Sequence, residues 1–583
     1  MYNQAQTGLF KGMNPRVTLA AMLVVISAVF LAGLHTETTG RSLEALRGWL
    51  TPFLEWFYVA LVAFLLLFMI WLGNGRYKNV RLGGDHERPQ FTFFSWVAML
   101  FAAGTGIGIL FWSVAQPIIQ FQSNPFVDEG LTPEAATIAM RLTYFHWGLN
   151  GWAIFGFVGL VLGYFAYRQN LPLTIRSALT PLLGDRVRGY VGDMVDTLAV
   201  FGTVFGIATT LGLGVQQLNA GLYQVFGLLP SIPLQLLVIA TIMTIAVVSV
   251  VSGVQRGVRI LSEVNFWLSI AALGFMLLFG PTQYLIGLTI EATGDYMQNL
   301  LAMTFHTNVT RGSDWQAEWT VFFWGWWLAW SPFVGMFIAR ISRGRTFREF
   351  VLGVLLAPTL ITVVWIGVFG GTALYHELFG GGGVIDAVAV DVSMALFATI
   401  EEMQIGSFTP LVGTLLIVLI ATYLITSANA GTLVINTILS GGDAEPPRIH
   451  RIIWGVVLAV LTAVLLIAGG LEVLQAAVIA AALPFSLVVI AMIAGLLRAL
   501  GDERFAAREG VMSTKPAEPW AVSDHTNAGS TTPPEPQEAS NGMPDAPLDP
   551  RMLGEHPARR DNAGEDQRAA SSPAQITESG SRD

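Results

Sequence analysis

The 583-residue sequence contains no cysteine and little charge, since Asp, Glu, Lys and Arg together make up only 12% of it. The lack of cysteine excludes disulfide frameworks, thiolate metal sites and cysteine nucleophiles. The eight histidines are scattered without the spacing of a zinc site. The net charge of −9 argues against nucleic acid as a partner. Soluble domains carry about twice this share of charge, so the composition indicates a membrane protein.

Long apolar runs replace the missing charge, because 53% of the residues are hydrophobic. A membrane-spanning helix needs about 20 mostly apolar residues. The sequence therefore predicts an all-α polytopic membrane protein with twelve transmembrane helices. The predicted spans cover roughly residues 16–34, 51–72, 91–121, 137–167, 192–226, 232–252, 258–284, 318–340, 350–376, 409–438, 452–470 and 473–498.

Basic residues are distributed unevenly between the connections. The even-numbered connections carry sixteen Lys and Arg and the odd-numbered ones four, which predicts that both termini lie in the cytoplasm, in a cytoplasmic (inner) membrane. Residues 285–305 have the pattern of an amphipathic helix on the outer, periplasmic surface. Residues 501–583 hold 8 Lys and Arg against 15 Asp and Glu, and the Pro- and Ser-rich part at 510–583 is predicted to be a disordered acidic cytoplasmic tail.

Three classes of function fit a polytopic membrane protein: a carrier, a channel and an intramembrane enzyme. The sequence has neither an HExxH motif nor a GxSxG elbow, so we expect no enzyme. A channel would usually be a smaller symmetric repeat with a filter-like loop. A carrier predicts two corresponding spans that glycine or proline interrupts beside a site at mid-membrane.

Two spans carry such interruptions. The third contains Gly104, Gly106 and Gly108, which weaken a helix and let a ligand approach the backbone. The eighth contains Ser331-Pro332-Phe333, and a proline removes one helical hydrogen bond. Close packing of small residues between helices is the alternative interpretation of the glycines.

Aromatic side chains gather near both interruptions. Trp326, Trp327 and Trp330 share one face of the eighth span, and Trp330 falls near mid-membrane rather than at the interface where tryptophan is usual. A second set lies in the fourth span at Trp147, Trp152 and Phe155. Aromatic rings at this depth suit a cage for a cation that has no N–H to donate. Core packing explains one such set easily and two less well.

Isolated charges within membrane spans are candidates for function. Asp193 and Asp196 near the start of the fifth span and Glu263 in the seventh are the clearest. Glu263 could instead pair with Arg259, one helical turn away.

Six segments, which follow one another in the same order as in the family, resemble the betaine/choline/carnitine transporter family over roughly residues 10–505. The most specific is FFWGWWLAWSPFVGMFIARISRGRTFREF at 322–350. The others are GTGIGILFW, HWGLNGW, TVFGIATTLGLG at 203–214, SGVQRGVRILSEVN at 252–265 and ITSANAGTLVINTILSGG at 425–442.

The resemblance implies a leucine-transporter-type fold with two inverted five-helix repeats, and it also implies a homotrimer. The first repeat would cover residues 91–290 (helices 3–7) and the second 318–500 (helices 8–12). Residues 1–90 would form an N-terminal segment with peripheral helices 1 and 2.

The resemblance also implies a substrate site. Its aromatic box falls on Trp147, Trp152, Phe155, Trp326, Trp327 and Trp330, beside the glycines 104, 106 and 108. Phe155 stands where glycine betaine carriers of the family have tyrosine, which removes a hydroxyl but keeps a ring. A carboxylate at the position of Gly108 is associated with choline, so glycine there favours a zwitterion such as a betaine.

A sodium site is implied as well, without any other cofactor. It would use the backbone oxygens of Ala102, Thr105 and Tyr423 and the side-chain hydroxyls of Thr426 and Ser427. A second site, with Thr203 and Phe333, should be weak or absent because Ile207 replaces one hydroxyl. Arg256 matches an arginine that serves as a tethered cation in sodium-independent members, although snorkelling to the interface is its default.

These patterns predict a secondary active transporter that imports a betaine-like compatible solute with Na⁺ by alternating access. A sodium-independent exchanger of carnitine- or betaine-type compounds is the first alternative. A gated solute channel is the alternative from another class.

Overall fold

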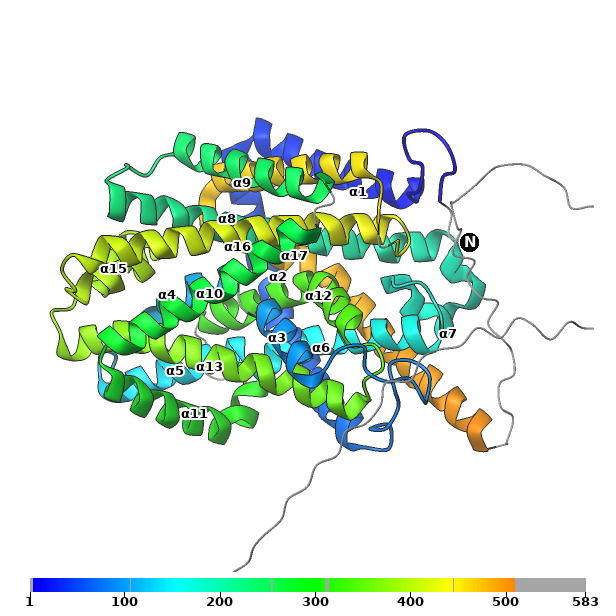
Figure 1. Ribbon diagram of the computed structural model, residues 1–583, viewed down its shortest axis with the longest axis horizontal. Helices are drawn as coiled ribbons and strands as arrows, with labels where there is room; N and C mark the ends of the chain where they lie inside the picture. Colours follow the sequence, from blue (N-terminus) through cyan, green and yellow to red (C-terminus); the bar gives the residue numbers. More distant parts are fainter. Residues whose placement is uncertain (1–3, 105, 253–254, 310–313, 444, 509–583) are drawn as a thin grey trace, which may run out of the picture. The chain divides into compact units, whose positions relative to one another are not determined.

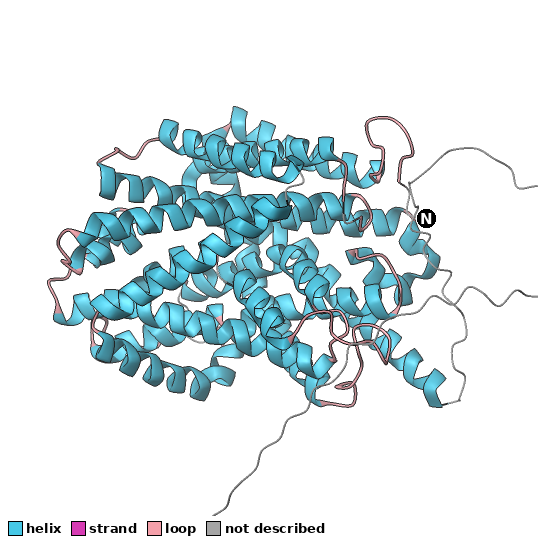
Figure 2. Ribbon diagram, in the orientation of Figure 1, coloured by secondary structure: helices cyan, strands magenta, loops and turns pink. Residues whose placement is uncertain are grey.

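The computed structural model describes residues 4–508 apart from 105, 253–254, 310–313 and 444. Within these residues the chain is helical and contains no β-strand, as Figure 2 shows. The all-α prediction is therefore confirmed for the described part of the chain. The predicted disordered tail at 510–583 lies outside the described residues.

The first part of the chain, up to residue 226, contains eight α-helices joined by short connections. They are α1 (Pro15–Leu34), α2 (Thr36–Asn74), α3 (Phe93–Gly104), α4 (Ile107–Gln122), α5 (Pro133–Trp147), α6 (Leu149–Gly163), α7 (Thr180–Leu183) and α8 (Tyr190–Phe226). Short π and 3₁₀ turns lie between α6 and α8 at η1 (Tyr164–Arg168), η2 (Ile175–Leu179) and η3 (Gly184–Arg188).

The rest of the described chain contains nine further α-helices. They are α9 (Ile232–Ser252), α10 (Gln255–Phe279), α11 (Thr282–Thr304), α12 (Val321–Ile341), α13 (Phe347–Phe379), α14 (Val384–Val390), α15 (Ala395–Glu402), α16 (Phe408–Leu439) and α17 (Arg448–Arg508). A π-helical turn, η4 (Gln316–Thr320), leads directly into α12, and the 3₁₀ turn η5 (Val392–Met394) precedes α15.

Ten helices of the described chain are long and apolar enough to cross a membrane. The pair α3 and α4 is not among them, because each is too short alone. The last candidate, within α17, leaves helical geometry at Gly469 and Gly470 and so contains two helical segments. The chain is a multi-pass membrane protein. The count of twelve spans, the inverted repeats and the side on which the termini lie stay predictions.

The third span is interrupted as the glycines predict. Helix α3 ends at Gly104 and α4 begins at Ile107, with Gly106 in an extended conformation at the α4 N-terminus. The helix break at this position is confirmed.

The predicted interruption of the eighth span is wrong, because α12 runs without a break from Val321 to Ile341 with Pro332 inside it. A proline removes the hydrogen bond to the carbonyl four residues earlier, which here belongs to Leu328. The Ser331 hydroxyl donates to that same carbonyl at 2.8 Å. The serine thus satisfies the carbonyl that the proline leaves free, and the helix continues.

A break that the sequence did not predict divides the fourth span, where α5 ends at Trp147 and α6 begins at Leu149. Thr132 caps the start of α5 by accepting the backbone N–H of Ala135, and Pro133 occupies the first helical position. Residues 285–305, predicted as an amphipathic helix, fall almost entirely within α11, which lies beside α5 and α13 (Figure 1). Its place on the periplasmic surface stays a prediction.

Candidate substrate-binding site

The break at Gly148 frees backbone groups, and side chains from two other helices satisfy them. The N–H of Leu149 donates to the Tyr296 hydroxyl of α11 at 3.1 Å. The carbonyl of His146 accepts the indole N–H of Trp327 of α12 at 2.9 Å. A Cβ at Gly148 would lie 2.8 Å from the Tyr296 hydroxyl, so glycine permits this approach. The break therefore fixes α12 and α11 against the fourth span.

Around this break the two predicted aromatic sets form one cluster. Trp147 lies edge-on to Trp327, with ring centroids 4.8 Å apart. Phe155 contacts Trp327 at 5.5 Å and Trp330 at 5.8 Å, and Trp152 contacts Phe155 at 5.5 Å. These contacts join side chains of α5, α6 and α12. The structure thus brings together the aromatic residues Trp147, Trp152, Phe155, Trp326, Trp327 and Trp330.

Polar contacts hold the ring orientations. The indole N–H of Trp147 donates to the side chain of Gln116 at 3.2 Å, and that of Trp326 donates to the carbonyl of Gly206 at 3.3 Å. Trp330 is the partly exposed member of the cluster and stacks on Phe333 at 5.7 Å. It is therefore the ring that a ligand reaches most easily.

The glycines that follow the third-span break differ in their surroundings. A Cβ at Gly108 would lie 2.8 Å from Trp147 and 2.9 Å from Trp326, so the α4 backbone touches the aromatic cluster directly. A Cβ at Gly106 would meet no atom of the described residues within 4 Å, so Gly106 does not pack against the rings as Gly108 does. The side-chain surroundings of Gly104 lie outside the described residues.

Trp324 lies outside the cluster although it belongs to the same helix. Its ring packs edge-on against Phe145 at 5.3 Å and lies 5.7 Å from the imidazole of His146. It is 1% exposed. Its contacts with Phe145 and His146 place it on a different face of α12 from Trp330.

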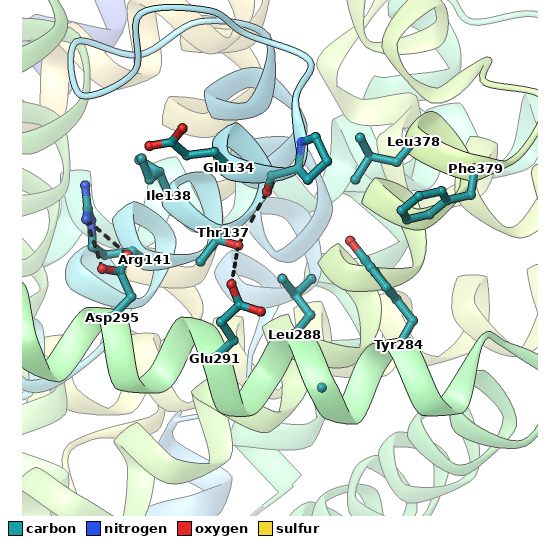
Figure 3. Close-up of a pocket in the computed structure, with 12 residues that line it drawn as sticks. Glu134, Thr137, Ile138, Arg141, Tyr284, Leu288, Glu291, Asp295, Leu378 and Phe379 are labelled. Carbon is teal, nitrogen blue, oxygen red and sulfur yellow. Dashed lines mark hydrogen bonds and ion pairs between the residues drawn. The ribbon is translucent and has the colours of Figure 1, made fainter.

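A separate cavity of about 620 Å³ lies between α5, α11 and the end of α13 (Figure 3). Arg141 forms an ion pair with Asp295 at 3.0 Å, and the Thr137 hydroxyl donates to Glu291 at 3.3 Å (Figure 3). Burial, and then the charge of Glu291, raise the pKa of Tyr284 to about 12, so its phenol stays protonated. The Arg141–Asp295 and Thr137–Glu291 contacts fasten α11 to α5.

The predicted sodium ligands are only partly described. Thr105 lies outside the described residues, and Ala102 lies near the end of α3. Tyr423, Thr426 and Ser427 belong to the uninterrupted helix α16. The Thr426 hydroxyl donates to the carbonyl of Thr422 at 2.5 Å and accepts the side-chain amide of Asn265 at 2.8 Å.

At the second predicted sodium position, the Thr203 hydroxyl donates to the carbonyl of Ala199 at 2.7 Å. Ile207 is buried and lies next to Gly431. Phe333 stacks on Trp330. These contacts leave the Thr203 hydroxyl hydrogen-bonded within its own helix.

Of the predicted charged candidates, Asp193 and Asp196 form a buried network with a partner the sequence did not suggest. Arg176 of η2 donates to Asp193 at 2.8 Å and to Asp196 at 2.5 Å. Asn14 also donates to Asp193, at 2.7 Å. Removing one member would leave a buried charge unpaired at a cost of about 3–5 kcal/mol, so the network ties η2 to the start of α8. The side chains of Arg256 and Arg259 lie outside the described residues, which leaves the expected pairing of Glu263 untested.

Sequence reasoning missed Gln116, His146 and Tyr296, which hold the aromatic cluster from outside. One signal was available for Gln116, since Gln116 and Gln120 are the two amide side chains of the predicted third span and lie one helical turn apart. His146 drew attention only as the first residue of the segment HWGLNGW. Nothing in the sequence connects Tyr296 with the break at Gly148.

Known proteins resemble this chain over most of its length. Residues 16–505 match the family described as BCCT, betaine/carnitine/choline family transporter. A glycine betaine transporter of Acinetobacter baylyi is 42% identical over 494 residues, which are 84% of this chain and 74% of that protein. A high-affinity choline transport protein of Escherichia coli is 40% identical over 511 residues, 86% of this chain and 74% of that protein.

A third relative differs in the substrate that its name gives. The ectoine/hydroxyectoine transporter of Virgibacillus pantothenticus is 37% identical over 489 residues, which are 84% of this chain and 97% of that protein. Members of the matched family are transporters rather than enzymes. Because the family match covers nearly all of the described chain, the protein belongs to the betaine/carnitine/choline transporter family.

Proposed function

We propose that the protein is a secondary active transporter that imports a betaine-like quaternary ammonium compound, coupled to Na⁺, by alternating access. The observation that carries the proposal is the cluster of six aromatic side chains from α5, α6 and α12, which touches the α4 backbone at Gly108. A desolvated cation–π contact contributes about 2 kcal/mol, and several rings can face one methylated ammonium. We place the protein in the cytoplasmic membrane as a homotrimer on the basis of the family resemblance.

The surroundings of Gly108 favour a zwitterion over a simple cation. A carboxylate side chain at this position would have to pass between the rings of Trp147 and Trp326, because its Cβ alone would lie within 3 Å of both. The site therefore supplies ring faces for an ammonium group but no counter-ion at this point. A substrate that carries its own carboxylate, such as glycine betaine or ectoine, fits that arrangement, and relatives named for both substrates support it.

Sodium coupling rests on the hydroxyls of Thr426 and Ser427 in α16 and on the family resemblance. One observation favours the sodium-independent exchanger as a second candidate. Ile207 offers no hydroxyl to join that of Thr203, so at most one of the two family sodium sites retains its side-chain ligands.

Uptake of radiolabelled glycine betaine into proteoliposomes tests the proposal. We expect accumulation above the external concentration when an inward Na⁺ gradient is imposed, and little accumulation without it. Uptake that ignores the gradient but requires internal substrate would establish exchange instead. Uptake that never exceeds the external concentration would establish a channel.

A panel of unlabelled solutes identifies the substrate within this class. Glycine betaine, choline, ectoine, carnitine and taurine are each added in excess over labelled glycine betaine. We expect glycine betaine to compete more strongly than choline, because choline lacks a carboxylate. Stronger competition by choline would contradict the interpretation of Gly108.

A further inference from the structure

A chain of buried polar side chains links α4, α5 and the start of α12 beside the aromatic cluster. Gln116, His146 and Thr320 are each at most 1% exposed. The Trp147 indole nitrogen lies 3.2 Å from Gln116 Oε1, and Gln116 Nε2 lies 2.7 Å from His146 Nδ1. His146 Nε2 lies 3.1 Å from Thr320 Oγ1. Three consecutive hydrogen bonds therefore run from a ring of the cluster to the turn that precedes α12.

The chemistry of the first donor fixes the direction of the next two bonds. An indole N–H can only donate, so the amide oxygen of Gln116 must face Trp147. The amide NH₂ of Gln116 then faces His146 Nδ1, which has to accept. The imidazole proton therefore sits on Nε2 and is donated to the Thr320 hydroxyl. His146 is thereby specified as the neutral tautomer protonated at Nε2.

His146 holds the second half of the cluster as well. Its backbone carbonyl accepts the Trp327 indole N–H at 2.9 Å because the helix break at Gly148 follows two residues later. Its ring stacks on Phe323 of α12, with centroids 4.8 Å apart and planes 17° apart. One residue thus connects a ring of α5 with a ring of α12.

We propose that Gln116 and His146 are positioning residues that set the relative orientation of Trp147 and Trp327, with His146 held neutral and protonated at Nε2. Neither side chain needs to touch the substrate. The effect on transport rests on the proposed function, whereas the tautomer is a property of the protein and can be measured without any substrate.

NMR of protein labelled with nitrogen-15 histidine in lipid bilayers tests the tautomer. The signals of His146 are assigned by their loss in His146→Gln. We expect a protonated Nε2 and an unprotonated Nδ1. In Gln116→Glu the new carboxylate has no N–H to donate, so we expect the proton to appear on Nδ1. A proton on Nδ1 in the unmodified protein, or no change in Gln116→Glu, would overturn the assignment.

Transport kinetics of variants at Gln116 test the positioning role. Gln116→Met removes both hydrogen bonds, and we expect the apparent KM for glycine betaine to rise about tenfold while the maximal rate changes less than about twofold. Gln116→Glu keeps the acceptor for Trp147, and we expect a rise of about threefold.

Gln120 provides the matched control. It lies one turn further along α4, is 0% exposed, and accepts the indole N–H of Trp315 at 2.7 Å. The Trp315 ring lies 5.8 Å from the imidazole of His146, but its hydrogen bond to Gln120 is not one of the three bonds that start from Trp147. Gln120→Met should therefore raise the KM much less than Gln116→Met. Equal effects of the two methionine variants, or an unchanged KM in Gln116→Met, would reduce Gln116 to a packing residue. Absence of glycine betaine uptake by the unmodified protein would instead refute the proposed function and leave the NMR result standing.

Discussion

Two of the glycine interruptions in the described helices, between α3 and α4 and between α5 and α6, have opposite surroundings. Between α3 and α4, a Cβ at Gly106 would meet no atom of the described residues within 4 Å. Between α5 and α6, a Cβ at Gly148 would lie 2.5 Å from the carbonyl of Tyr144 and 2.8 Å from the hydroxyl of Tyr296. Partner groups fill the second break, whereas no group of the described residues packs against Gly106 at the first.

The difference separates two uses of irregular backbone within a membrane. Non-helical backbone at membrane depth is tolerated where it lines a cavity or where protein groups satisfy it. At the α3/α4 break no partner group among the described residues approaches Gly106. The α5/α6 break is of the second kind, because Tyr296 and Trp327 bind its freed groups. It anchors the aromatic rings rather than admitting a ligand.

Replacement of glycine by alanine at each of the two breaks should give the largest difference in uptake of glycine betaine. In Gly148→Ala the added methyl group meets a backbone carbonyl that cannot move away, and we expect uptake of glycine betaine to fall about 100-fold. In Gly106→Ala the methyl group meets no atom of the described residues, and we expect a change of no more than about threefold. Membrane yield is measured for both variants. Equal losses would mean that the two breaks are not distinct.

Loss of one ring should have the next largest effect. Trp330→Leu removes the partly exposed ring of the cluster, and we expect the apparent KM for glycine betaine to rise tenfold or more, about the value of one desolvated cation–π contact. Trp324→Leu removes a ring that packs against Phe145, and we expect a much smaller rise. Similar KM values for the two variants would show that both rings merely pack.

Loss of the hydrogen bond between Tyr296 of α11 and Leu149, at the α5/α6 break, should have a moderate effect. Tyr296→Phe leaves the partly buried N–H of Leu149 without its acceptor, which costs about 1 kcal/mol of stability. We expect a lower Tm in detergent and an uptake rate reduced by about threefold. Tyr284→Phe on the same helix removes a hydroxyl at the separate cavity and should change neither quantity. A normal Tm in Tyr296→Phe would show that the break does not depend on α11.

The smallest effect is expected from removal of the C-terminal residues after Gly510. Glu503 of α17 accepts a hydrogen bond from the Tyr164 hydroxyl at 2.9 Å and pairs with Arg168, so α17 is fastened to the body before residue 510. The acidic residues beyond are repelled by anionic lipid. Truncation after Gly510 should leave uptake unchanged across a series of osmolalities. Strong osmotic activation that disappears on truncation would show that the tail is a sensor.

The break in the third span could be predicted because three alternating glycines weaken any helix. The break at Gly148 could not, since a lone glycine in an apolar run looks the same as the packing glycine Gly151. What distinguishes Gly148 is Tyr296, a residue remote in sequence whose hydroxyl replaces the helical acceptor of Leu149. Local sequence does not contain that information.

The opposite error occurred at Pro332, where local sequence predicted a break that the structure lacks. The preceding Ser331 donates to the carbonyl that the proline leaves free, so the helix continues. Asp193 and Asp196 were candidates for function because no partner was evident, and Arg176 supplies it from a 3₁₀ turn. Helical spacing predicts only that Trp327 and Trp330 share one face, and the contacts with Trp147 and Phe155 of the fourth span are visible in the structure alone. The role of these rings as a substrate site stays a prediction.

The central claim is that the aromatic cluster binds the ammonium group of the substrate. Its most direct test is displacement of labelled glycine betaine from the purified protein by two fragments, tetramethylammonium and acetate. Tetramethylammonium carries only the ammonium group and acetate only the carboxylate. We predict that tetramethylammonium displaces the label and that this displacement weakens in Trp330→Leu, whereas acetate has little effect in either protein. Displacement by acetate but not by tetramethylammonium would contradict the claim.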